Sequence, residues 1–352
     1  MNVYEVDTPA LVVDLDALEQ NIARMQRYCD AHGLKLRPHI KTHKTTAIAQ
    51  MQMAAGACGI ACQKLGEAEV MVNAGIKDVL IPYNILGAQK LDRLMRLSRR
   101  ATITVAADSE YTVRGISNAA RADGTTIHVI VELDIHAGRC GVQSPEAALD
   151  LARKIAELPS LAFCGVMTMP SRPEMNAFLQ RTLELLDEAG LPHPIVSGGS
   201  TPTSFLSHQV YGLTEIRVGE YIFGGLGHLL SGWCTEEQCA LNVHTTVVSR
   251  PTPDRAILDG GSKTFSAVVR QTPDGPRVGY IREYPKARFR GASEEHGNVD
   301  VSACSEKPKI GERVRVIPAH VCPCVNEHDE MVAVRNEKVE AIWPISARGK
   351  VR

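Results

Sequence analysis

The sequence lacks the features that would assign it to a membrane, to secretion or to a polyanionic partner. No part of its 352 residues approaches the ~20 consecutive apolar residues that a membrane helix needs. The N-terminus shows neither the basic region nor the apolar region of a signal peptide. The formal net charge is -1, so charge predicts neither a nucleic acid nor an anionic membrane as partner. We therefore expect a cytoplasmic protein whose ten scattered cysteines are reduced thiols.

The sequence also lacks the motif of a dinucleotide-binding fold. No GxGxxG pattern follows the first expected strand, and there is no short-period repeat or low-complexity tract. Hydrophobic residues make up 44% and charged residues 22% of the chain, so apolar material suffices for a sizeable core. At roughly 150 residues per domain, the length predicts about two domains.

Residues 10 to 225 alternate between strand-like and helix-like segments. Short β-branched or apolar runs are separated by segments whose apolar residues recur at spacings of three and four. The expected strands are 10–13, 36–41, 59–63, 79–83, 103–107, 128–133, 162–168 and 194–198. This alternation predicts a parallel sheet with helical crossovers, either an open doubly wound sheet or a closed (β/α)8 barrel. The missing GxGxxG favours the barrel.

After about residue 240 the pattern changes to strands separated by turn residues, with hardly any helical period. The expected strands are 241–248, 255–259, 299–301, 313–317, 331–334 and 339–343. This part of the sequence predicts a second, all-β domain.

The segment 37–44 ends an expected strand, and five of its eight residues are arginine, lysine or histidine. In a βα barrel the active site lies at the carboxyl ends of the strands. A lysine at this place can form a Schiff base with an aldehyde if burial and neighbouring cations lower its pKa, and Lys41 is the candidate. The alternative is a solvated basic turn, because charge runs are usually surface features.

A loop rich in glycine and hydroxyl residues follows the expected strand that ends near Val196. It contains Ser197, Gly198, Gly199 and Thr201. Glycines let backbone N–H groups approach a phosphate, and hydroxyls add donors. Barrels commonly bind phosphate in the loops after their last two strands. The alternative is an ordinary loop, since such loops are the commonest of all.

The segment around His320 and Cys322 is a candidate metal site. If it is extended, the two side chains point the same way, because side chains alternate along a strand. Imidazole and thiolate suit zinc or another late divalent metal, and two protein ligands leave positions open for water and substrate. Cys324 falls on the same face, so a Cys-x-Cys contribution stays open. The alternative is a buried loop with incidental cysteines.

Together these clusters resemble one known family. The segments that carry the resemblance are 7–11, 37–44, 138–142, 197–199, 320–323 with Asn326, His328 and Asp329, and 345–349. In these segments, which span nearly the whole chain in the right order, the chain is similar to the D-threonine aldolase and D-serine dehydratase group of fold-type III pyridoxal-phosphate (PLP) enzymes, relatives of alanine racemase. The resemblance implies a (β/α)8 barrel over residues 14–238. It also implies a β-domain made of 1–13 plus 239–352, which the first strand joins and which carries the metal ligands.

The resemblance further implies roles for the matching residues. Lys41 would hold the PLP aldehyde, and His320 and Cys322 would hold a divalent metal, zinc or alternatively manganese. The residues that it assigns to the cofactor are Ser197, Gly198, Gly199, Thr201, Arg217, Gly219 and Tyr221. It also implies a homodimer with the site at the interface and a small D-amino acid as substrate.

Three features set this chain apart within the family pattern. Family aldolases usually carry His-x-Asp at the metal pair, whereas the dehydratase branch carries His-x-Cys, as this chain does at 320–322. The aldolase run that ends in Tyr-His-Gly is replaced by 167–171, which changes the expected substrate pocket. Arg217 resembles the arginine that faces the pyridine nitrogen in alanine racemase. An arginine cannot protonate this nitrogen and would weaken the ring as an electron sink.

These features favour β-elimination from a D-β-hydroxy amino acid such as D-serine or 3-hydroxy-D-aspartate, which gives a 2-keto acid and ammonia. Lys41 would remove the α-proton, and the metal would bind the β-hydroxyl as a Lewis acid. The runner-up is retro-aldol cleavage of D-threonine-like substrates to glycine and an aldehyde, with His43 as the base. Racemisation, suggested by Arg217, and a PLP-binding carrier without turnover are further alternatives.

Overall fold

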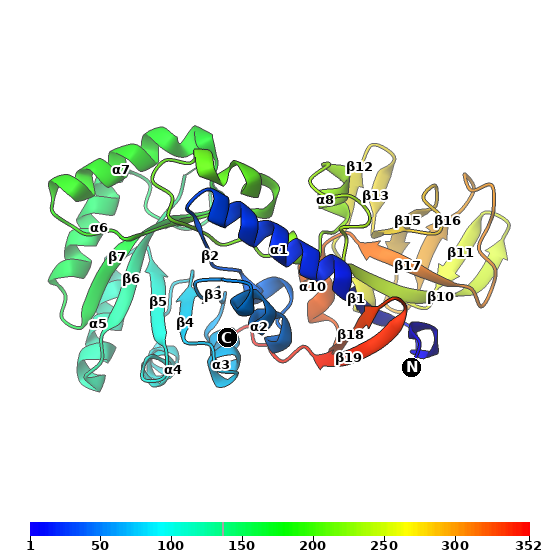
Figure 1. Cartoon of the computed structure of the whole chain (residues 1–352), viewed down its shortest axis with the longest axis horizontal. Coiled ribbons are helices and arrows are strands. Elements are labelled where there is room, and N and C mark those ends of the chain that lie inside the picture. Colours follow the sequence, from blue (N-terminus) through cyan, green and yellow to red (C-terminus); the bar gives the residue numbers. More distant parts are fainter. Residues whose placement is uncertain (136) are drawn as a thin grey trace. The chain divides into compact units, whose positions relative to one another are not determined.

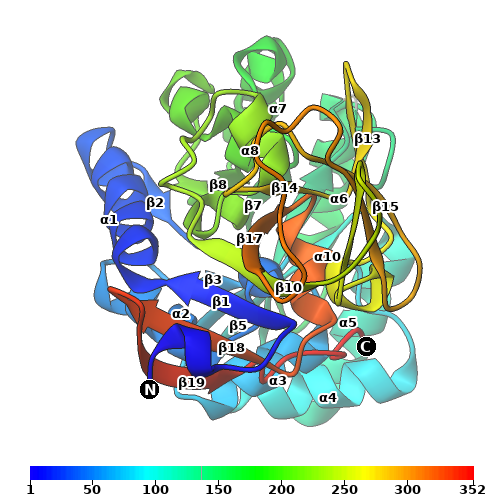
Figure 2. The same cartoon turned by 90° about the vertical axis from the view of Figure 1, so that its right-hand side faces the viewer.

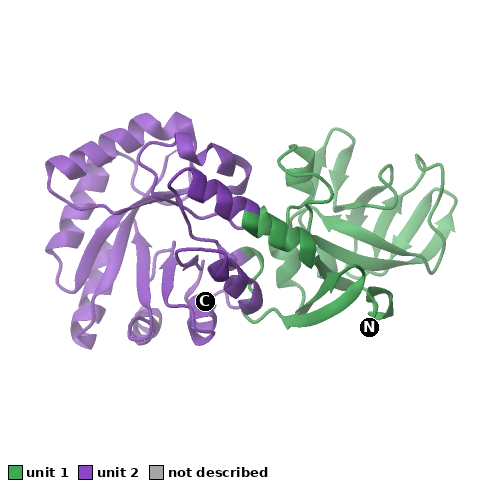
Figure 3. Cartoon of the chain, viewed as in Figure 1, with its two compact units in different colours: residues 1–23, 42–45, 220–349 green, residues 24–41, 46–219, 350–352 purple. Residues whose placement is uncertain are grey.

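The computed structural model describes residues 1–135 and 137–352, which form two compact units (Figure 3). The first unit contains residues 1–23, 42–45 and 220–349, and the second contains 24–41, 46–219 and 350–352. Helix α1 (Leu15–Ala31) begins in the first unit and ends in the second. The domain boundaries implied by the resemblance, 14–238 for the barrel and 1–13 plus 239–352 for the β-domain, stay a prediction.

The second unit is built on a parallel sheet with the strand order β2-β9-β8-β7-β6-β5-β4-β3. Strands β2 to β7 of this sheet are labelled in Figure 1. These strands are β2 (Lys35–Leu36), β3 (Ile60–Ala61), β4 (Asp78–Ile81), β5 (Thr102–Ala107), β6 (Ile127–Leu133), β7 (Leu161–Thr168), β8 (Ile195–Gly198) and β9 (Glu215–Ile216). The two ends of the sheet meet just after β2, where His39 forms a parallel bridge with Ala61 and the Ala61 N–H donates to the Pro38 carbonyl at 2.8 Å. The predicted (β/α)8 fold is therefore confirmed.

Helices accompany these strands. They are α2 (Thr46–Ala54), α3 (Leu65–Asn73), α4 (Ala88–Ser98), α5 (Glu110–Asp123), α6 (Pro145–Glu157) and α7 (Asn176–Glu188), with the 3-10 helices η2 (Ile40–Thr42), η3 (Pro173–Met175) and η4 (Thr201–Gln209). The N-terminus of helix α6 is capped, because Ser144 Oγ accepts the Ala147 N–H at 3.1 Å, and Pro145 occupies the first turn. The covered strands β5 and β6 are buried over nearly their whole length, which explains their continuous apolar runs.

The first unit is a mainly antiparallel β-structure. Its elements are η1 (Val3–Glu5), β1 (Ala10–Asp14), η5 (Glu220–Ile222), α8 (Leu226–Leu230), β10 (Leu241–Thr252), β11 (Arg255–Leu258), α9 (Ser262–Phe265), β12 (Arg270–Thr272), β13 (Gly275–Arg277), β14 (Gly279–Ile281), β15 (Arg288–Ala292), β16 (Gly297–Asp300), β17 (Arg313–Pro318), α10 (Val321–Asn326), β18 (Glu330–Arg335) and β19 (Lys338–Pro344). The main sheet has the order β11-β16-β15-β14-β17-β10-β1-β18-β19, and an additional β10–β11 pairing closes part of it into a barrel.

Strand β1 belongs to this sheet and not to the parallel barrel (Figure 2). It pairs antiparallel with β10 and parallel with β18. Its central residues Leu11, Val12 and Val13 are buried, so both faces of the strand contribute to the core of this unit. The first strand therefore pairs with strands of the β-structure.

Among the described residues, no helix combines the length and the apolar character that crossing a bilayer requires.

Candidate functional site

Lys41 lies just beyond the carboxyl end of β2 in the barrel. The backbone ladder between β2 and β9 continues past both strands, since the Arg37 N–H donates to the Ile216 carbonyl at 3.0 Å and the His39 N–H donates to the Val218 carbonyl at 2.9 Å. Lys41 follows two residues later, and its N–H donates to His39 Nδ1 at 3.3 Å. Within the described part of the chain its ammonium has no hydrogen-bond or ion-pair partner. The lysine is therefore free for chemistry.

The predicted phosphate loop follows β8, which is the other neighbour of β9. The Arg217 N–H donates to the Gly198 carbonyl at 2.7 Å, so the ends of β8 and β9 are in register. Gly199 has a φ of +107° and its N–H donates to Ser171 Oγ at 2.6 Å. Thr201 begins η4, whose first turn offers backbone donors. The ends of β2, β9 and β8 thus bring the lysine, the arginine and the loop to one edge of the barrel.

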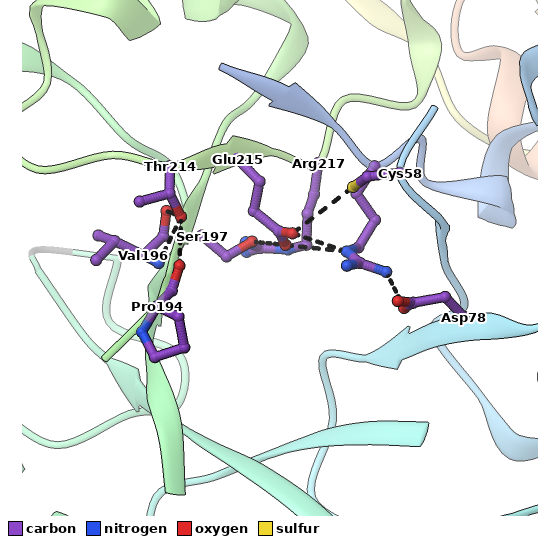
Figure 4. A network of polar contacts seen from close by, with 9 residues as sticks. Cys58, Asp78, Pro194, Val196, Ser197, Thr214, Glu215 and Arg217 are labelled. Atoms are coloured by element: carbon purple, nitrogen blue, oxygen red, sulfur yellow. Dashed lines mark hydrogen bonds and ion pairs between the residues drawn. The ribbon is translucent and has the colours of Figure 1, made fainter. Parts of the chain in front are cut away.

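Arg217 is buried at this edge and contacts the loop (Figure 4). Its guanidinium donates to Ser197 Oγ at 2.5 Å and to the Thr168 carbonyl at 3.2 Å. Burial lowers the pKa of Arg217 to about 10, against the opposing effect of the Glu215 carboxylate. The side chain therefore keeps its positive charge at neutral pH.

A buried ion pair lies next to Arg217 and ties β2 to β9 (Figure 4). The Arg37 Nε donates to Glu215 Oε2 at 2.9 Å, and its Nη1 lies 2.5 Å from Asp78 Oδ1. Glu215 also accepts the Ser197 hydroxyl at 2.6 Å. Burial opposes the charge of Arg37, but the carboxylate of Glu215 raises its pKa above the ordinary value. Within the basic segment, Arg37 therefore serves the structure.

Glu132 on β6 supports the fit of a polar cofactor inside the barrel. Its side chain is buried, and its Oε2 has no hydrogen-bond partner among the described residues. Its Oε1 accepts from Arg139 at 3.2 Å. Burial raises the pKa of Glu132, and the charges of Arg139 and Arg217 oppose this effect. A buried polar atom without a partner is costly, so a polar ligand that reached it would stabilise the site.

In the first unit, His320, Cys322 and Glu220 form a compact group of metal-binding side chains. Their ligand atoms all lie within 4.8 Å of one another. Glu220 Oε1 is 2.9 Å from His320 Nε2 and 3.4 Å from Cys322 Sγ. On the other side, Cys322 Sγ lies 3.3 Å from Thr42 Oγ1. All three side chains are partly exposed. An imidazole, a thiol and a carboxylate in this arrangement fit a divalent metal.

Two neighbouring histidines favour the ionised form of Glu220. Burial disfavours its ionised form, but the hydrogen bond with His320 and the nearby His228 lower the pKa of Glu220 to about 2. His228 Nδ1 lies 3.4 Å from Glu220 Oε2. Burial lowers the pKa of His228 itself.

The predicted extended geometry of the metal segment is wrong. His320 has an extended backbone but serves as the N-cap of α10, which contains Cys322 and Cys324. The helical turn separates the two cysteines. Cys324 is fully buried, lies 3.3 Å from the Thr264 carbonyl, and is not part of the group around Cys322.

Two further predicted residues, His43 and Tyr221, lie in the first unit. His43 is fully buried, and its Nδ1 accepts the Thr45 N–H at 3.1 Å. Tyr221 is also buried, within η5. Gly219, the last residue of the second unit in this part of the chain, is buried directly before Glu220. The catalytic role of His43 and the cofactor roles of Gly219 and Tyr221 stay predictions.

The sequence analysis missed Glu215 and Glu220. Glu215 opens the two-residue strand β9, which is too short for any periodic signal. Glu220 stands a hundred positions before His320. A carboxylate directly after the Arg217–Gly219 stretch was the one available signal, and it has no spacing rule that would connect it to His320 and Cys322.

Comparisons with known proteins match both parts of the chain. The model of the alanine racemase N-terminal domain matches residues 13–227, and a serine dehydratase domain model matches residues 240–334. A D-threonine aldolase from Arthrobacter sp. is 37% identical over 98% of this chain and 93% of its own length. A D-threo-3-hydroxyaspartate dehydratase from Delftia sp. (strain HT23) is 34% identical over 90% of this chain and 91% of its own.

A solved structure agrees with these matches. The crystal structure of D-threonine aldolase from Filomicrobium marinum superposes with a TM-score of 0.90 and 33% identity, covering 99% of this chain and 97% of that one. The similarity thus extends through the barrel and the β-structure together. The chain is a member of the D-threonine aldolase and D-serine dehydratase family of PLP-dependent lyases, with an alanine racemase-like barrel.

Proposed function

We propose that the chain catalyses β-elimination from a D-β-hydroxy amino acid of the D-serine or 3-hydroxy-D-aspartate type, giving a 2-keto acid and ammonia. The names of the relatives, which act on D-threonine and on D-threo-3-hydroxyaspartate, support a substrate with a D-configured α-carbon and a β-hydroxyl. The observation that carries elimination is the pair His320 and Cys322, whose ligand atoms lie within 4.8 Å of each other and match the His-x-Cys of the dehydratase branch.

Lys41 is the residue that we assign to the cofactor aldehyde and to the α-proton. When bound, PLP supplies an electron sink for the charge that forms at the α-carbon. The amine of Lys41, once free, takes the α-proton through Nζ. We assign the surroundings of the phosphate to Ser197, Gly198, Gly199, Thr201, Gly219 and Tyr221. We assign Arg217 to the ring nitrogen, where a charged guanidinium gives up no proton and leaves the ring a weak sink.

A metal held by His320 and Cys322 would offset that weakness. As a Lewis acid it supplies stabilisation for a departing β-hydroxyl. The soft thiolate favours zinc, with manganese as the alternative. Thr42, which lies 3.3 Å from Cys322 Sγ, directly follows Lys41 in the sequence. A D-threo-3-hydroxyaspartate dehydratase has been solved as a Cys→Ala variant in a metal-free form, which supports a metal in this branch.

A product assay tests the proposal. Purified enzyme with PLP and zinc receives D-serine, D-threonine or the 3-hydroxyaspartates separately, and ammonia, 2-keto acid, glycine and aldehyde are quantified. We expect equal amounts of ammonia and 2-keto acid, and loss of the reaction after chelation and in Lys41→Ala. The exposed Lys35 gives the matched control, since Lys35→Ala should keep activity. Glycine and an aldehyde without ammonia would contradict elimination.

Retro-aldol cleavage is the second candidate, and the aldolase names of two relatives favour it. This reaction needs a base for the β-hydroxyl proton, and His43 is the predicted one. His43 is fully buried, and a substrate would have to reach its ring for the histidine to act as this base. In the same assay a retro-aldol enzyme would produce glycine, and a racemase would keep its activity after chelation.

We also propose a homodimer with the site at its interface, and a cytoplasmic location. The assembly is checked by light scattering of the PLP-loaded protein, which should give twice the mass of one chain. A single-chain mass together with full activity would contradict an interfacial site.

A further inference from the structure

We propose that Glu220 is a third protein ligand of the metal, so that a carboxylate oxygen, an imidazole nitrogen and a thiolate hold the ion together. This inference rests on the proposed metal site at His320 and Cys322 and adds a residue to it. Glu220, His320 and Cys322 form the one group of three potential ligands with mutual distances within 4.8 Å in the described residues 1–135 and 137–352.

The distances within the group already approximate those around a bound ion. Ligand bonds of about 2.0–2.3 Å to a tetrahedral zinc place neighbouring ligand atoms roughly 3.3–3.6 Å apart. Glu220 Oε1 lies 2.9 Å from His320 Nε2 and 3.4 Å from Cys322 Sγ. Glu220 Oε1 thus has to move away from His320 Nε2 and Cys322 Sγ by about half an ångström or less to admit the metal, a shift that side-chain torsions provide.

The second oxygen of Glu220 faces a buried histidine behind the metal group. Glu220 Oε2 lies 3.4 Å from Nδ1 of His228. The side chain of His228 is buried, and its ring meets the ring of Trp233 edge-on at 5.3 Å between centroids. Groups behind a ligand that fix its orientation are a regular part of metal sites. Glu220 therefore presents Oε1 to His320 and Cys322, while Oε2 lies next to His228.

The backbone also fixes the position of Glu220. The segment that follows it packs closely on the segment that leads to Cys322, because Gly225 approaches both Val321 and the Pro318 carbonyl. A Cβ at Gly225 would lie 3.3 Å from Val321 Cγ1, and the φ of +132° favours glycine there. The backbone five residues after Glu220 is thus packed against the segment that leads to Cys322, which keeps the two segments of the metal group together.

Coordination by Glu220 would also balance the charge of a divalent ion and complete the usual number of protein ligands of a catalytic zinc site. A carboxylate and a thiolate together balance a divalent ion, while the imidazole stays neutral. Three protein ligands leave one tetrahedral position open, which is the arrangement of catalytic zinc sites. The competing interpretation is a plain ion pair between Glu220 and His320. That pair would contribute to folding but would not set the affinity for the metal.

Metal binding separates the two interpretations without any measurement of activity. The full-length protein is freed of metal by a chelator and titrated with Co²⁺, and its Zn²⁺ affinity is obtained by competition with a chromophoric chelator. Glu220→Gln keeps the shape of the side chain and removes its charge. Glu312→Gln is the matched control, since Glu312 accepts the Tyr284 hydroxyl at 2.5 Å and is not part of the metal group. Cys322→Ser tests the underlying metal site.

We expect Glu220→Gln to weaken Zn²⁺ binding by about 10- to 100-fold or more. Its Co²⁺ complex should show altered visible d–d bands and keep the near-ultraviolet thiolate-to-cobalt band. Glu312→Gln should match the wild type, and Cys322→Ser should lose the thiolate band. Far-UV circular dichroism of the metal-free proteins checks folding. If Glu220→Gln fails to fold, Glu220→Ala, which also removes the charged carboxylate, decides, with the same loss of affinity expected.

Two results overturn different claims. Wild-type Zn²⁺ affinity and an unchanged Co²⁺ spectrum in the folded Glu220 variant would show that Glu220 is only the ion-pair partner of His320, and the proposed function would stand. A wild-type protein that binds no metal, or a thiolate band that persists in Cys322→Ser, would remove the proposed metal site itself.

Discussion

Among the basic residues of segment 37–44, contact with buried carboxylates distinguishes the residue that stabilises the fold from the residue that is available for catalysis. Arg37 is enclosed by Glu215 and Asp78, whereas Lys41, four positions later, is partly exposed and its ammonium has no partner among the described residues. A carboxylate that loses its cation inside a protein cannot be compensated by water. The two basic residues therefore differ in what their removal costs. Removing Arg37 lowers stability, and removing Lys41 lowers activity.

Arg37→Met should lower the free energy of unfolding by about 3–5 kcal/mol, because it removes the buried ion-pair partner of Glu215. Urea denaturation followed by circular dichroism measures the change. The exposed helical pair of Arg96 and Asp92 gives the control, and Arg96→Ala should cost no more than about 1 kcal/mol. Equal losses of unfolding free energy in the two variants would show that the ion pair of Arg37 and Glu215 contributes no more to stability than an exposed pair.

His244 on β10 makes stability depend on pH. Burial, with Arg315 opposite it on β17 and the further arginines 313 and 282, lowers the pKa of His244 to about 4. In the unfolded chain the pKa is about 6.5. Between these values only the unfolded state binds the proton, so stability falls as pH decreases from 6.5 to 4.

The variant His244→Gln should lose this part of the pH dependence. Between pH 7 and pH 4.5 we expect the wild type to lose roughly 2 kcal/mol more stability than the variant, at about 1.4 kcal/mol per unit of pKa shift. Urea denaturation at both pH values measures it, with the exposed His296→Gln as control. Parallel losses in wild type and His244→Gln would contradict a neutral buried histidine.

At the scale of elements, long buried strands were predictable and short or capped segments were not. The expected strand 103–107 differs from β5 by one residue, and 128–133 differs from β6 by one, because continuous apolar runs mark buried parallel strands. The expected strand 36–41 is instead the short β2 followed by η2. A two-residue strand is defined by its neighbours in the barrel, and one sequence carries no signal for them.

The candidate site divides in the same way. Lys41 and the loop at 197–199 follow strands whose patterns the sequence displays, so their placement at strand ends could be predicted. The pairing of Cys322 with Glu220 and Thr42 depends on contacts between segments 102 and 280 positions apart. No periodicity connects such positions, and only the folded chain reveals them.

The close pairing of the parallel strands β7 and β8 depends on one glycine. Gly165 has a φ of +133°, and a Cβ there would lie 1.9 Å from the Ile195 carbonyl oxygen. We expect Gly165→Ala to destabilise the fold by more than about 3 kcal/mol. Gly124, the C-cap of α5 at a φ of +72°, has nothing within 4 Å of such a Cβ, so Gly124→Ala should cost about 1–2 kcal/mol. Thermal unfolding compares them, and similar midpoints would contradict the steric argument.

At the scale of the whole molecule, the chain leaves one unit and enters the other between Lys41 and Thr42, and again between Gly219 and Glu220. In both places a residue assigned to the cofactor is followed directly by a residue that contacts Cys322. The family similarity extends over both units, which is expected if neither part performs the reaction alone.

The central claim of the account is a division of labour between Lys41 and the metal group of His320 and Cys322. Proton NMR of D-serine or 3-hydroxy-D-aspartate in D₂O tests it most directly, with PLP-loaded enzyme before and after removal of metal. We predict that the metal-free enzyme exchanges the α-hydrogen for deuterium with little release of ammonia, that zinc restores elimination, and that Lys41→Ala abolishes both. Full elimination without metal, or exchange that persists in Lys41→Ala, would contradict the account.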